Sequence, residues 1–218
     1  PKLRTVTGVR ASHLDIHQYD LRTRVLYHAE PYLVRSVDLI IANSKAGCSH
    51  AVARGFPAKR LQTIPNGIDT ERFRPDPLGR RALRDAWGIG DDTILIGLIA
   101  RLDPMKDHET FLRAAASLGE RRSDLAFVCV GDEGGVSRAG LQRLAKELGI
   151  HRRLAWIPGS GDMTAVFNAC DLTCSTSAFG EGFSNALAEA MACGRRCVAT
   201  DVGDSREIVA DTGIVVPS

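Results

Sequence analysis

The sequence predicts an α/β protein built of doubly wound parallel sheets, and three observations support that prediction. Short, nearly continuous apolar runs recur along the chain, most clearly at residues 37–42, 93–100 and 125–130. Strands that are buried on both faces show such runs, whereas half-exposed strands alternate polar and apolar residues. Segments with helical spacing separate the runs, as helical crossovers between parallel strands require. A turn-rich stretch at residues 66–76 divides the pattern into two units.

The first unit, residues 1–65, is expected to hold three strands and two helices. Val25, Ala29 and Leu33 recur at helical spacing. Ser44 belongs to the residue types that cap helix N-termini, and Gly55 to those that end helices. In chain order we expect a strand at 5–9, a helix at 21–36, a strand at 37–42, a helix at 45–54 and a strand at 61–64.

The linker at residues 66–76 leads to the second unit, residues 77–218. Asn66-Gly67 is a turn dipeptide, and prolines follow at 75 and 77, a composition typical of a connection between domains. Asp107 is placed to cap the helix that follows it. The expected helices are 80–87, 107–118, 136–148, 162–169, 183–193 and 205–209, and the expected strands are 93–100, 125–130, 154–157, 171–174, 196–200 and 213–216. Because the pattern stops on a strand, we expect this unit to be clipped at its end and the chain to be part of a longer protein.

Composition and charge exclude several classes of protein. Of the 218 residues 44% are hydrophobic and 25% charged, which argues against disorder. The formal net charge of +2 gives no sign of a dedicated nucleic-acid binder, and no apolar run reaches the roughly 18 residues of a membrane span. The six cysteines lie largely in apolar runs, so we expect buried thiols in a reducing compartment rather than metal ligands. They stand at positions 48, 129, 170, 174, 193 and 197.

Three strand-to-helix junctions of the second unit are candidate binding sites, because doubly wound sheets bind ligands beyond the carboxyl ends of their strands. The first carries Arg101 and Lys106 beside a helix N-terminus. Free N–H groups and cations together suit a diphosphate there, although surface ion pairs with Asp103 or Asp107 are the alternative. The second junction begins at Gly131 and is rich in glycine, but it lacks the dinucleotide-binding fingerprint.

A third junction is the most informative. Gly180 and Gly182 leave the start of the expected helix bare, so that the N–H groups from Gly182 to Asn185 face a ligand. Glu181 stands just before the helix, and Glu189 stands about two turns into it. Helical side chains lean toward the N-terminus, so Glu189 is able to reach back toward a bound group. These carboxylates suit sugar hydroxyls; the alternative is that Glu181 only complements the helix dipole and Glu189 is exposed.

Four landmarks, in this order along the chain, resemble those of the retaining GT-B glycosyltransferases of family 4. They are Ile64-Pro65-Asn66-Gly67-Ile68-Asp69 with Phe73, Arg101-x4-Lys106, Gly131-Asp132, and Glu181-Gly182-Phe183 followed by Glu189-Ala190-Met191-Ala192-x-Gly194. The likeness covers residues from about 37 to 218. It implies a GT-B-like fold of two Rossmann-type domains that face each other across a cleft. The end of the acceptor-side domain then lies at 1–65 and the donor-binding domain at 77–218.

The resemblance also implies roles for single residues. Arg101 and Lys106 would hold the diphosphate of a nucleotide sugar and stabilise its charge as it leaves, and Glu181 would bind sugar hydroxyls. These three are the expected catalytic residues. The expected substrate-binding residues are Gly182, Phe183, Ser184, Asn185, Glu189, Gly131 and Ile157. Among them, backbone N–H groups near Ser184 would add to the diphosphate site, Glu189 would bind the ribose, and Ile157 would lie in the segment that meets the base.

The partners implied by the resemblance are a sugar nucleotide and a carbohydrate or glycolipid acceptor, with no nucleic acid and no metal or other cofactor. The family also implies a cytoplasmic role in polysaccharide biosynthesis, with peripheral membrane contact through other regions. Two features depart from the family pattern. The glycine-rich loop of the first domain is absent from this sequence, and Arg10, with His13 nearby, stands where the family often has a histidine. No catalytic role is assigned to either residue.

Three other functions compete with glycosyl transfer. A nucleotide-sugar binding module without turnover keeps the fold and the donor site, and it is the expectation for the fragment itself. A nucleotide-sugar epimerase also uses a two-domain GT-B fold, but it lacks this linker combined with this helix. A hydrolase would need Glu181 and Glu189 on either side of a scissile bond, whereas both belong to one helical segment beside a phosphate-like site.

Overall fold

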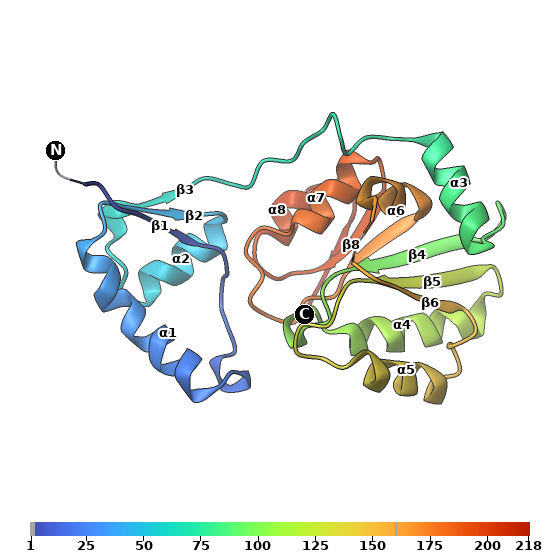
Figure 1. Ribbon diagram of the computed structural model, residues 1–218, viewed down its shortest axis with the longest axis horizontal. Helices are drawn as coiled ribbons and strands as arrows, with labels where there is room; N and C mark the ends of the chain where they lie inside the picture. Colours follow the sequence, from blue (N-terminus) through green and yellow to red (C-terminus); the bar gives the residue numbers. More distant parts are fainter. Residues whose placement is uncertain (1–2, 160) are drawn as a thin grey trace.

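The computed structural model describes residues 3–159 and 161–218, and within them it contains two all-parallel sheets joined by an extended segment (Figure 1). The first sheet has three strands and the second has six. Within the described residues, no helix combines the length and the apolar character that crossing a bilayer requires. The α/β class with parallel sheets, predicted from the apolar runs, is confirmed.

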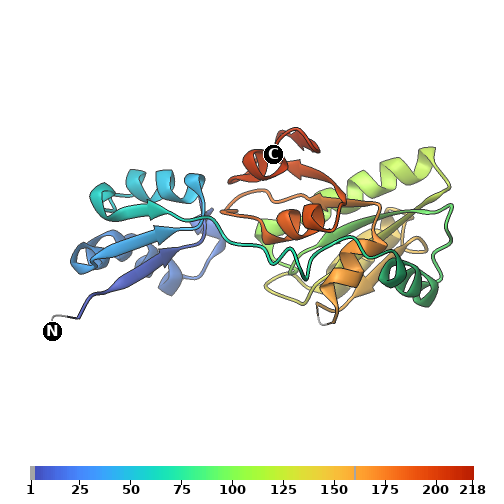
Figure 2. The ribbon, with the colours of Figure 1, turned by 90° about the horizontal axis from the view of Figure 1, so that it is seen from above.

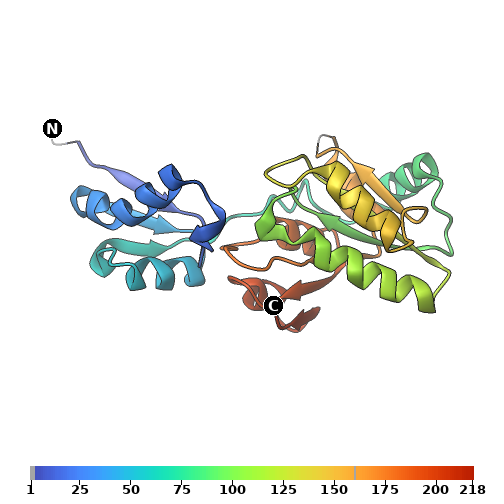
Figure 3. The same cartoon turned by 90° about the horizontal axis from the view of Figure 1, so that it is seen from below.

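The N-terminal unit is built on the three-stranded sheet. Its order is β1 (Val6–Val9), β2 (Leu39–Ala42) and β3 (Leu61–Thr63). The crossover helices α1 (Leu21–Leu33) and α2 (Lys45–Ala53) lie on one side of this sheet (Figures 1 and 3). Short 3-10 turns stand at Ile16–Gln18, Val34–Ser36 and Ala58–Arg60.

The helices of this unit begin at side-chain caps. The Asp20 carboxylate accepts the Thr23 N–H at 2.8 Å, and the Ser44 hydroxyl accepts the Gly47 N–H at 2.9 Å. A cap of this kind satisfies one of the N–H groups that the first helical turn leaves free. The capping expected of Ser44 is therefore confirmed.

The C-terminal unit is built on the six-stranded sheet. Its order is β6 (Leu154–Ile157), β5 (Leu125–Val130), β4 (Ile94–Ile99), β7 (Leu172–Ser175), β8 (Arg196–Thr200) and β9 (Ile214–Val216). The first strand in sequence, β4, is central, and the strand order reverses between it and β7. Such a reversal is the topological switch point at which doubly wound folds open a crevice for ligands.

Helices cover both faces of the six-stranded sheet. One face packs against α4 (His108–Arg121) and α5 (Arg138–Glu147). The other packs against α3 (Pro77–Trp87), α6 (Met163–Ala169), α7 (Asn185–Ala192) and α8 (Ser205–Val209). A 3-10 turn, Pro104–Lys106, precedes α4. Because α4 and α7 leave adjacent strands toward opposite faces, their N-terminal ends flank the switch point.

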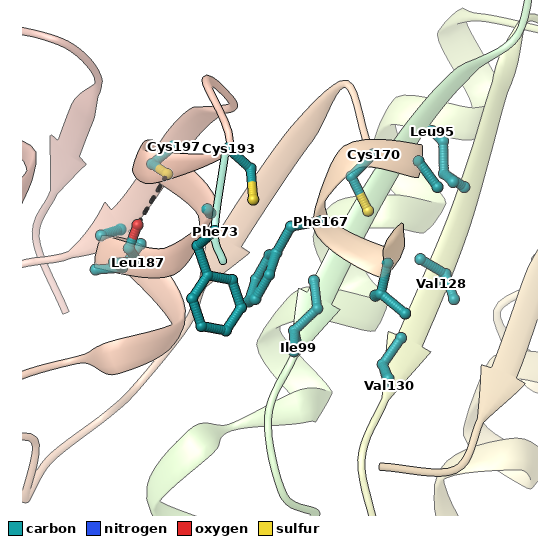
Figure 4. Packing of buried hydrophobic residues seen from close by; sticks show 14 of the residues in the cluster. Phe73, Leu95, Ile99, Val128, Val130, Phe167, Cys170, Leu187, Cys193 and Cys197 are labelled. Carbon is teal, nitrogen blue, oxygen red and sulfur yellow. Dashed lines mark hydrogen bonds between the residues drawn. The ribbon is translucent and has the colours of Figure 1, made fainter. Parts of the chain in front are cut away.

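The extended segment between β3 and α3 is anchored on the C-terminal unit. Phe73 is buried there, and its ring packs edge-on against that of Phe167 in α6, with centroids 6.1 Å apart (Figure 4). The Arg72 carbonyl accepts the Thr164 hydroxyl at 3.4 Å. Figure 2 shows the segment passing alongside α7 and reaching α6 before it enters α3. The segment therefore follows the surface of the second sheet's helices rather than crossing open solvent.

A charged cluster fastens α3 to the amino ends of β4 and β7. The buried Arg84 donates from Nη2 to the Gly90 and Thr93 carbonyls, at 2.7 and 2.6 Å. Its Nη1 donates to the Ala169 carbonyl at 3.0 Å and to the Asp171 carboxylate at 3.1 Å. Arg84 therefore ties together the starts of the two strands whose opposite ends form the switch point.

The predicted elements agree with the structure in type and order, with differences at their ends. Strands 125–130, 154–157 and 196–200 and helix 205–209 are as expected. The largest relevant error concerns the helix expected at 183–193, which begins at Asn185 instead. Ser184 has the extended backbone of an N-cap, with φ −80° and ψ 100°, so Phe183 lies before the helix and not in its first turn.

Candidate active site

The candidate site lies at the carboxyl ends of β4 and β7. These strands are parallel neighbours, with Leu98 paired to Cys174 near their ends. The loop after β4 carries Lys106, and the loop after β7 carries Glu181. Adjacent strands of a parallel sheet bring such loops to one edge, which is why residues 75 positions apart meet here.

Lys106 and Glu181 form the charged centre of the site. Lys106 Nζ donates to Glu181 Oε2, and the Ser177 hydroxyl donates to the same oxygen at 2.8 Å. The exposed fractions of the two charged side chains are 19% for Lys106 and 8% for Glu181. An ammonium group has three donors, so Lys106 retains the capacity to bind an anion beside Glu181. The sequence offered Asp103 or Asp107 as the alternative ion-pair partner of Lys106. In the structure Lys106 pairs with Glu181 instead.

The loop that presents Lys106 is shaped by two aspartates. Asp103 accepts the Met105 N–H at 3.0 Å and so closes the turn before Lys106. Asp107 has a left-handed backbone, with φ 43°, a conformation that aspartate tolerates better than most non-glycine residues because its short side chain bonds nearby backbone groups. Its carboxylate accepts the N–H and the hydroxyl of Thr110, at 3.1 and 2.6 Å, and thereby caps α4 as the sequence predicted.

The start of α7 faces the same region. The Ser184 hydroxyl makes no capping bond to this helix, so its first-turn N–H groups are not satisfied by a side-chain cap. A small cavity of about 10 Å³ is lined by Lys106 and Ser177 together with Ser184. The first-turn N–H groups, the positive end of the helix dipole and the Lys106 ammonium all favour negative charge here. On the outer side, Asn185 Oδ1 accepts from Asn66 Nδ2 at 2.8 Å.

Two glycines allow the N-terminal unit to press against the loop before α7. Gly180 has φ +75°, and a Cβ there would stand 3.0 Å from Leu14 Cδ2 of the N-terminal unit. A Cβ on Gly182 would stand 2.8 Å from both the Arg10 carbonyl oxygen and Asn43 Oδ1. Larger residues at these positions would push the two units apart. Arg10 therefore meets the site through its main chain.

Arg101 lies differently from Lys106. Its side chain is 63% exposed, and its guanidinium pairs with Asp103, on its own loop, at 3.3 Å. The aliphatic part of the side chain passes close to Gly134, where an added Cβ would lie 2.8 Å from the Arg101 Cδ. In this structure Arg101 thus forms the ion pair that the sequence offered as the alternative reading. Its role toward a diphosphate stays a prediction.

Glu189 is half-buried on α7, and its electrostatic neighbour is Arg72 of the extended segment. Burial raises the pKa of the Glu189 carboxyl, and the positive charge of Arg72 opposes that rise. The exposed position offered as the alternative for Glu189 is therefore not observed. A half-buried carboxylate with an incompletely compensated charge is a good acceptor for hydroxyl groups.

Gly131 and Ile157 lie together beside the end of β4. The Gly131 N–H donates to the Ile157 carbonyl at 3.0 Å, and a Cβ on Gly131 would stand 2.0 Å from the Ala100 carbonyl oxygen. Only glycine fits this close approach.

Phe183 lies elsewhere: its side chain lines a hollow of about 320 Å³ with Pro65 and Ile208. Any contact of Phe183 with a ligand at Lys106 would have to come from its backbone.

His108 is buried directly after this loop. It is 2% exposed, and neither ring nitrogen has a hydrogen-bond partner among the described residues. Burial lowers its pKa to about 4, so the ring is neutral at physiological pH. His13, by contrast, belongs to the N-terminal unit, where its ring packs edge-on against that of His50 with centroids 5.3 Å apart.

Cys174 lines the small cavity at this site, but none of the cysteines is placed there as a reactive thiol. Cys129, Cys170, Cys193 and Cys197 are buried, while Cys48 and Cys174 are partly buried. Burial raises the pKa of the Cys170 and Cys174 thiols to about 12, so they are protonated and unreactive at neutral pH. Within the described part of the chain, no three His, Cys, Asp or Glu side chains are grouped as metal ligands would be.

Sequence reasoning missed some residues that shape the site. Ser177 shares an oxygen of Glu181 with Lys106, and no motif points to it. Gly203 packs its backbone on the Glu181 and Gly182 carbonyls, where an added Cβ would stand 2.2 and 2.6 Å away. The glycine in Val202-Gly203-Asp204 was the available sequence signal, and the structure shows it at a φ of +64°.

Two family models match the chain. The model for glycosyl transferases group 1 matches residues 79–218, and the model for glycosyltransferase family 4 matches residues 6–72. Together they span both sheets and most of the extended segment.

Named relatives and solved structures agree with these matches. A GDP-mannose-dependent alpha-(1-6)-phosphatidylinositol monomannoside mannosyltransferase of Mycolicibacterium smegmatis is 35% identical, over 96% of this chain and 57% of its own length. A D-inositol 3-phosphate glycosyltransferase of Mycobacterium tuberculosis is 34% identical, over 86% of this chain and 39% of its own. The chain thus spans about half the length of the curated relatives it matches.

Among solved structures, Anabaena Alr3699/HepE in complex with UDP-glucose has a TM-score of 0.87 and 25% identity, over 98% of this chain and 58% of its own. WaaG, a glycosyltransferase involved in lipopolysaccharide biosynthesis, has a TM-score of 0.78 and 20% identity, over 100% of this chain and 65% of its own. The GT-B-like fold that the four landmarks implied is therefore confirmed.

Proposed function

The chain belongs to the glycosyl transferases of group 1, and we propose that its protein moves a sugar from a nucleotide-diphosphate sugar to a carbohydrate or glycolipid acceptor, with retention of anomeric configuration. The observation that supports this most is the Lys106–Glu181 pair beside the uncapped start of α7. It places a cation, helix N–H groups and a carboxylate at one switch point.

Each group has a distinct task in this proposal. As the bond from the anomeric carbon to the phosphate oxygen breaks, the diphosphate keeps the electron pair and gains negative charge. Lys106 and the first-turn N–H groups of α7, with Arg101 from the exposed side, stabilise that charge. Fixed donors aimed at developing charge lower a barrier by about 3 kcal/mol each. No metal is needed for this stabilisation.

The carboxylates recognise the rest of the donor. Glu181, held by Lys106 and Ser177, accepts hydrogen bonds from sugar hydroxyls, and the backbone of Gly182 and Phe183 adds contacts there. Glu189 accepts from the ribose, while Gly131 and Ile157 line the side of the nucleotide. The acceptor hydroxyl attacks from the side of the leaving group, and its proton passes to the departing diphosphate oxygen. We place this reaction in the cytoplasm, in polysaccharide or glycolipid assembly, as the family's role implies.

For the chain of 218 residues taken by itself, we propose donor binding without turnover, because it spans only 57% of the mannosyltransferase relative. Isothermal titration with UDP, GDP and ADP tests the site. We expect one of them to bind, and to bind more weakly to the Lys106→Ala variant. A folded sample that binds none of the three would contradict the proposal.

A hydrolase is tested separately with a nitrophenyl glycoside. We expect no release of nitrophenol above background, and no difference between the wild type and Glu181→Ala. Release that depends on Glu181 would favour acid/base hydrolysis by this carboxylate over glycosyl transfer.

A further inference from the structure

A buried carboxylate of the C-terminal unit binds the main chain of the N-terminal unit. Asp204, which precedes α8 and is 8% exposed, accepts the Lys45 N–H at 2.7 Å and the Ala46 N–H at 2.8 Å. Lys45 and Ala46 are the first two residues of α2. Asp204 therefore caps a helix that lies 158 residues away in the sequence and in the other unit.

This cap completes the first turn of α2. The helix's own cap, Ser44, takes the N–H of the third residue, Gly47, at 2.9 Å. Asp204 takes the two N–H groups that Ser44 leaves. Bonds from N–H groups to an ionised carboxylate are about twice as strong as neutral ones, and the positive end of the helix dipole strengthens them further. Beside them, the exposed Lys45–Glu207 pair, at 2.9 Å, adds little.

The same turn also holds the loop that carries Glu181. The Asp204 N–H donates to the Gly182 carbonyl at 3.0 Å. The preceding residue, Gly203, packs so closely that a Cβ would stand 2.2 Å from the Glu181 carbonyl oxygen. One residue thus bonds through its backbone to the loop at the candidate site and through its side chain to the opposite unit.

The N-terminal unit contacts that loop from the other side. The Ser12 N–H donates to the Gly180 carbonyl at 3.2 Å, and Gly182 leaves no room for a Cβ against the Arg10 carbonyl. The loop 180–182 therefore lies between residues 10–12 of one unit and residues 203–204 of the other. Its position depends on the two units staying together.

We propose that Asp204 is a positioning residue: its bonds to the start of α2 hold the N-terminal unit against the loop 180–182 and so set the position of Glu181 for the sugar of the donor. The claim that Asp204 sets Glu181 for the donor sugar rests on the proposed function. The claim that Asp204 holds the two units together does not, and it is measurable in the chain without a ligand.

Two substitutions remove the interaction from opposite sides. Asp204→Asn keeps the shape of the side chain and removes its charge. Lys45→Pro removes one of the two N–H donors, at the first helical position, where proline is favoured. Ser44 already has the extended backbone that a following proline requires, with φ −153° and ψ 154°. Lys45→Ala and Glu207→Gln are matched controls, because they break the exposed ion pair and leave both N–H bonds intact.

The Ser12 amide reports whether the units separate. It is bonded across the interface but is touched by none of these substitutions. We expect its hydrogen exchange to be about tenfold faster in Asp204→Asn and in Lys45→Pro, because exchange follows the population in which the units have opened. The two controls should stay within twofold of the wild type. The double variant should exchange faster than the wild type by less than the product of the two single-variant increases, since both changes act on one interaction.

Ser12 exchange that is unchanged in both Asp204→Asn and Lys45→Pro would overturn the proposal, and if Asp204→Asn fails to fold, Lys45→Pro alone decides. The sugar readout uses UDP with UDP-glucose, and GDP with GDP-mannose. We expect Asp204→Asn to lower affinity for the sugar nucleotide about tenfold, and affinity for the matching nucleotide less than threefold. Equal losses would overturn the positioning of Glu181. If the wild-type chain binds none of these four nucleotides, the proposed function and the positioning of Glu181 for the sugar are both contradicted. The Ser12 exchange result on the contact between the two units would still stand.

Discussion

The two edges of the six-stranded sheet each carry a partly buried ion pair at the ends of the same two strands, β4 and β7, and the pairs are built differently. At the amino edge, both terminal nitrogens of Arg84 have two acceptors each, among them Asp171. At the carboxyl edge, the Lys106 ammonium donates to a single acceptor among the residues that the structure describes, Glu181. Asp171 in turn accepts the Leu95 N–H at 2.8 Å, so the amino-edge cluster extends into the ladder itself.

This difference indicates that the Arg84 cluster is structural and that the Lys106–Glu181 pair is able to bind a ligand. Arg84 has nearly used its donors, and an added anion would find only Nε, which is buried and unpartnered. Lys106 keeps donors in reserve next to the uncapped start of α7. We therefore expect substitutions at the amino edge to change stability alone, and substitutions at the carboxyl edge to change ligand affinity.

The largest expected effect is at the amino edge. Arg84→Met leaves four carbonyl and carboxylate contacts without their donor, so we expect the free energy of unfolding to fall by about 4 kcal/mol. Urea unfolding measures this, with the exposed Arg81→Met on the same helix as the control, expected to change by less than about 0.5 kcal/mol. Nucleotide-diphosphate affinity of the folded variant should stay the same. If nucleotide-diphosphate affinity falls as well, the amino edge is not purely structural, and the distinction between the two edges is contradicted.

A somewhat smaller effect concerns His108, under the carboxyl edge. Its pKa in the folded chain is about 4 and its ordinary value is 6.5, so folding favours the neutral ring. The stability due to that preference is present above pH 6.5 and is lost as the pH falls toward 4. It amounts to about 3 kcal/mol. Unfolding measured between pH 7 and 4 should show this loss in the wild type and not in His108→Leu. The exposed His151→Leu variant is the control and should lose stability between pH 7 and 4 as the wild type does. If His108→Leu also shows the wild-type dependence of stability on pH, the loss is not due to His108.

At the carboxyl edge, Lys106→Ala removes the cation proposed for the diphosphate. We expect affinity for a nucleoside diphosphate to fall about thirtyfold, in line with the loss of a charge-assisted hydrogen bond. Affinity for the nucleoside should not change. Calorimetric titration of both ligands gives the comparison, with Lys146→Ala on α5 as an exposed control. If both affinities fall equally, Lys106 acts on the fold and not on the diphosphate.

The smallest effect is expected at Glu189. Glu189→Gln weakens the acceptor proposed for the ribose hydroxyls, so we expect affinity for a ribonucleoside diphosphate to fall about threefold to tenfold. Affinity for the deoxyribose analogue should be spared. Titration of the two nucleotides against the wild type and against the exposed Glu147→Gln control measures the difference. A loss of the same size on both nucleotides would refute the ribose assignment.

Features of this structure that depend on residues close together in the sequence were predictable, whereas those that depend on residues far apart in the sequence were not. The apolar runs predicted β4, β5 and their neighbours because buried parallel strands have a local signature. The cap at Asp107 was likewise readable from local residue types. The start of α7 was placed two residues early, because Gly182 and Phe183 fit a helix start as well as they fit the loop that precedes it.

The candidate site was predicted in part. Spacing placed Lys106 and Glu181 at one edge of the sheet, but it did not show that they would pair with each other rather than with Asp103 or with the helix dipole. The Asp204 contact with α2 has no local signature, since an aspartate after glycine is equally typical of an exposed turn. Interactions between side chain and backbone across two units depend on the tertiary arrangement, which one sequence does not specify.

The central claim is that Lys106 and the start of α7 form one seat for a diphosphate. A crystal structure of this chain with the nucleoside diphosphate that binds it tests the claim most directly. The account predicts a phosphate oxygen within 3.2 Å of Lys106 Nζ and another at a first-turn N–H group of α7, from Asn185 to Leu187. A nucleotide bound elsewhere would contradict it, for example in the hollow of about 600 Å³ between Arg72 and Asp162, with the Lys106–Glu181 pair left untouched.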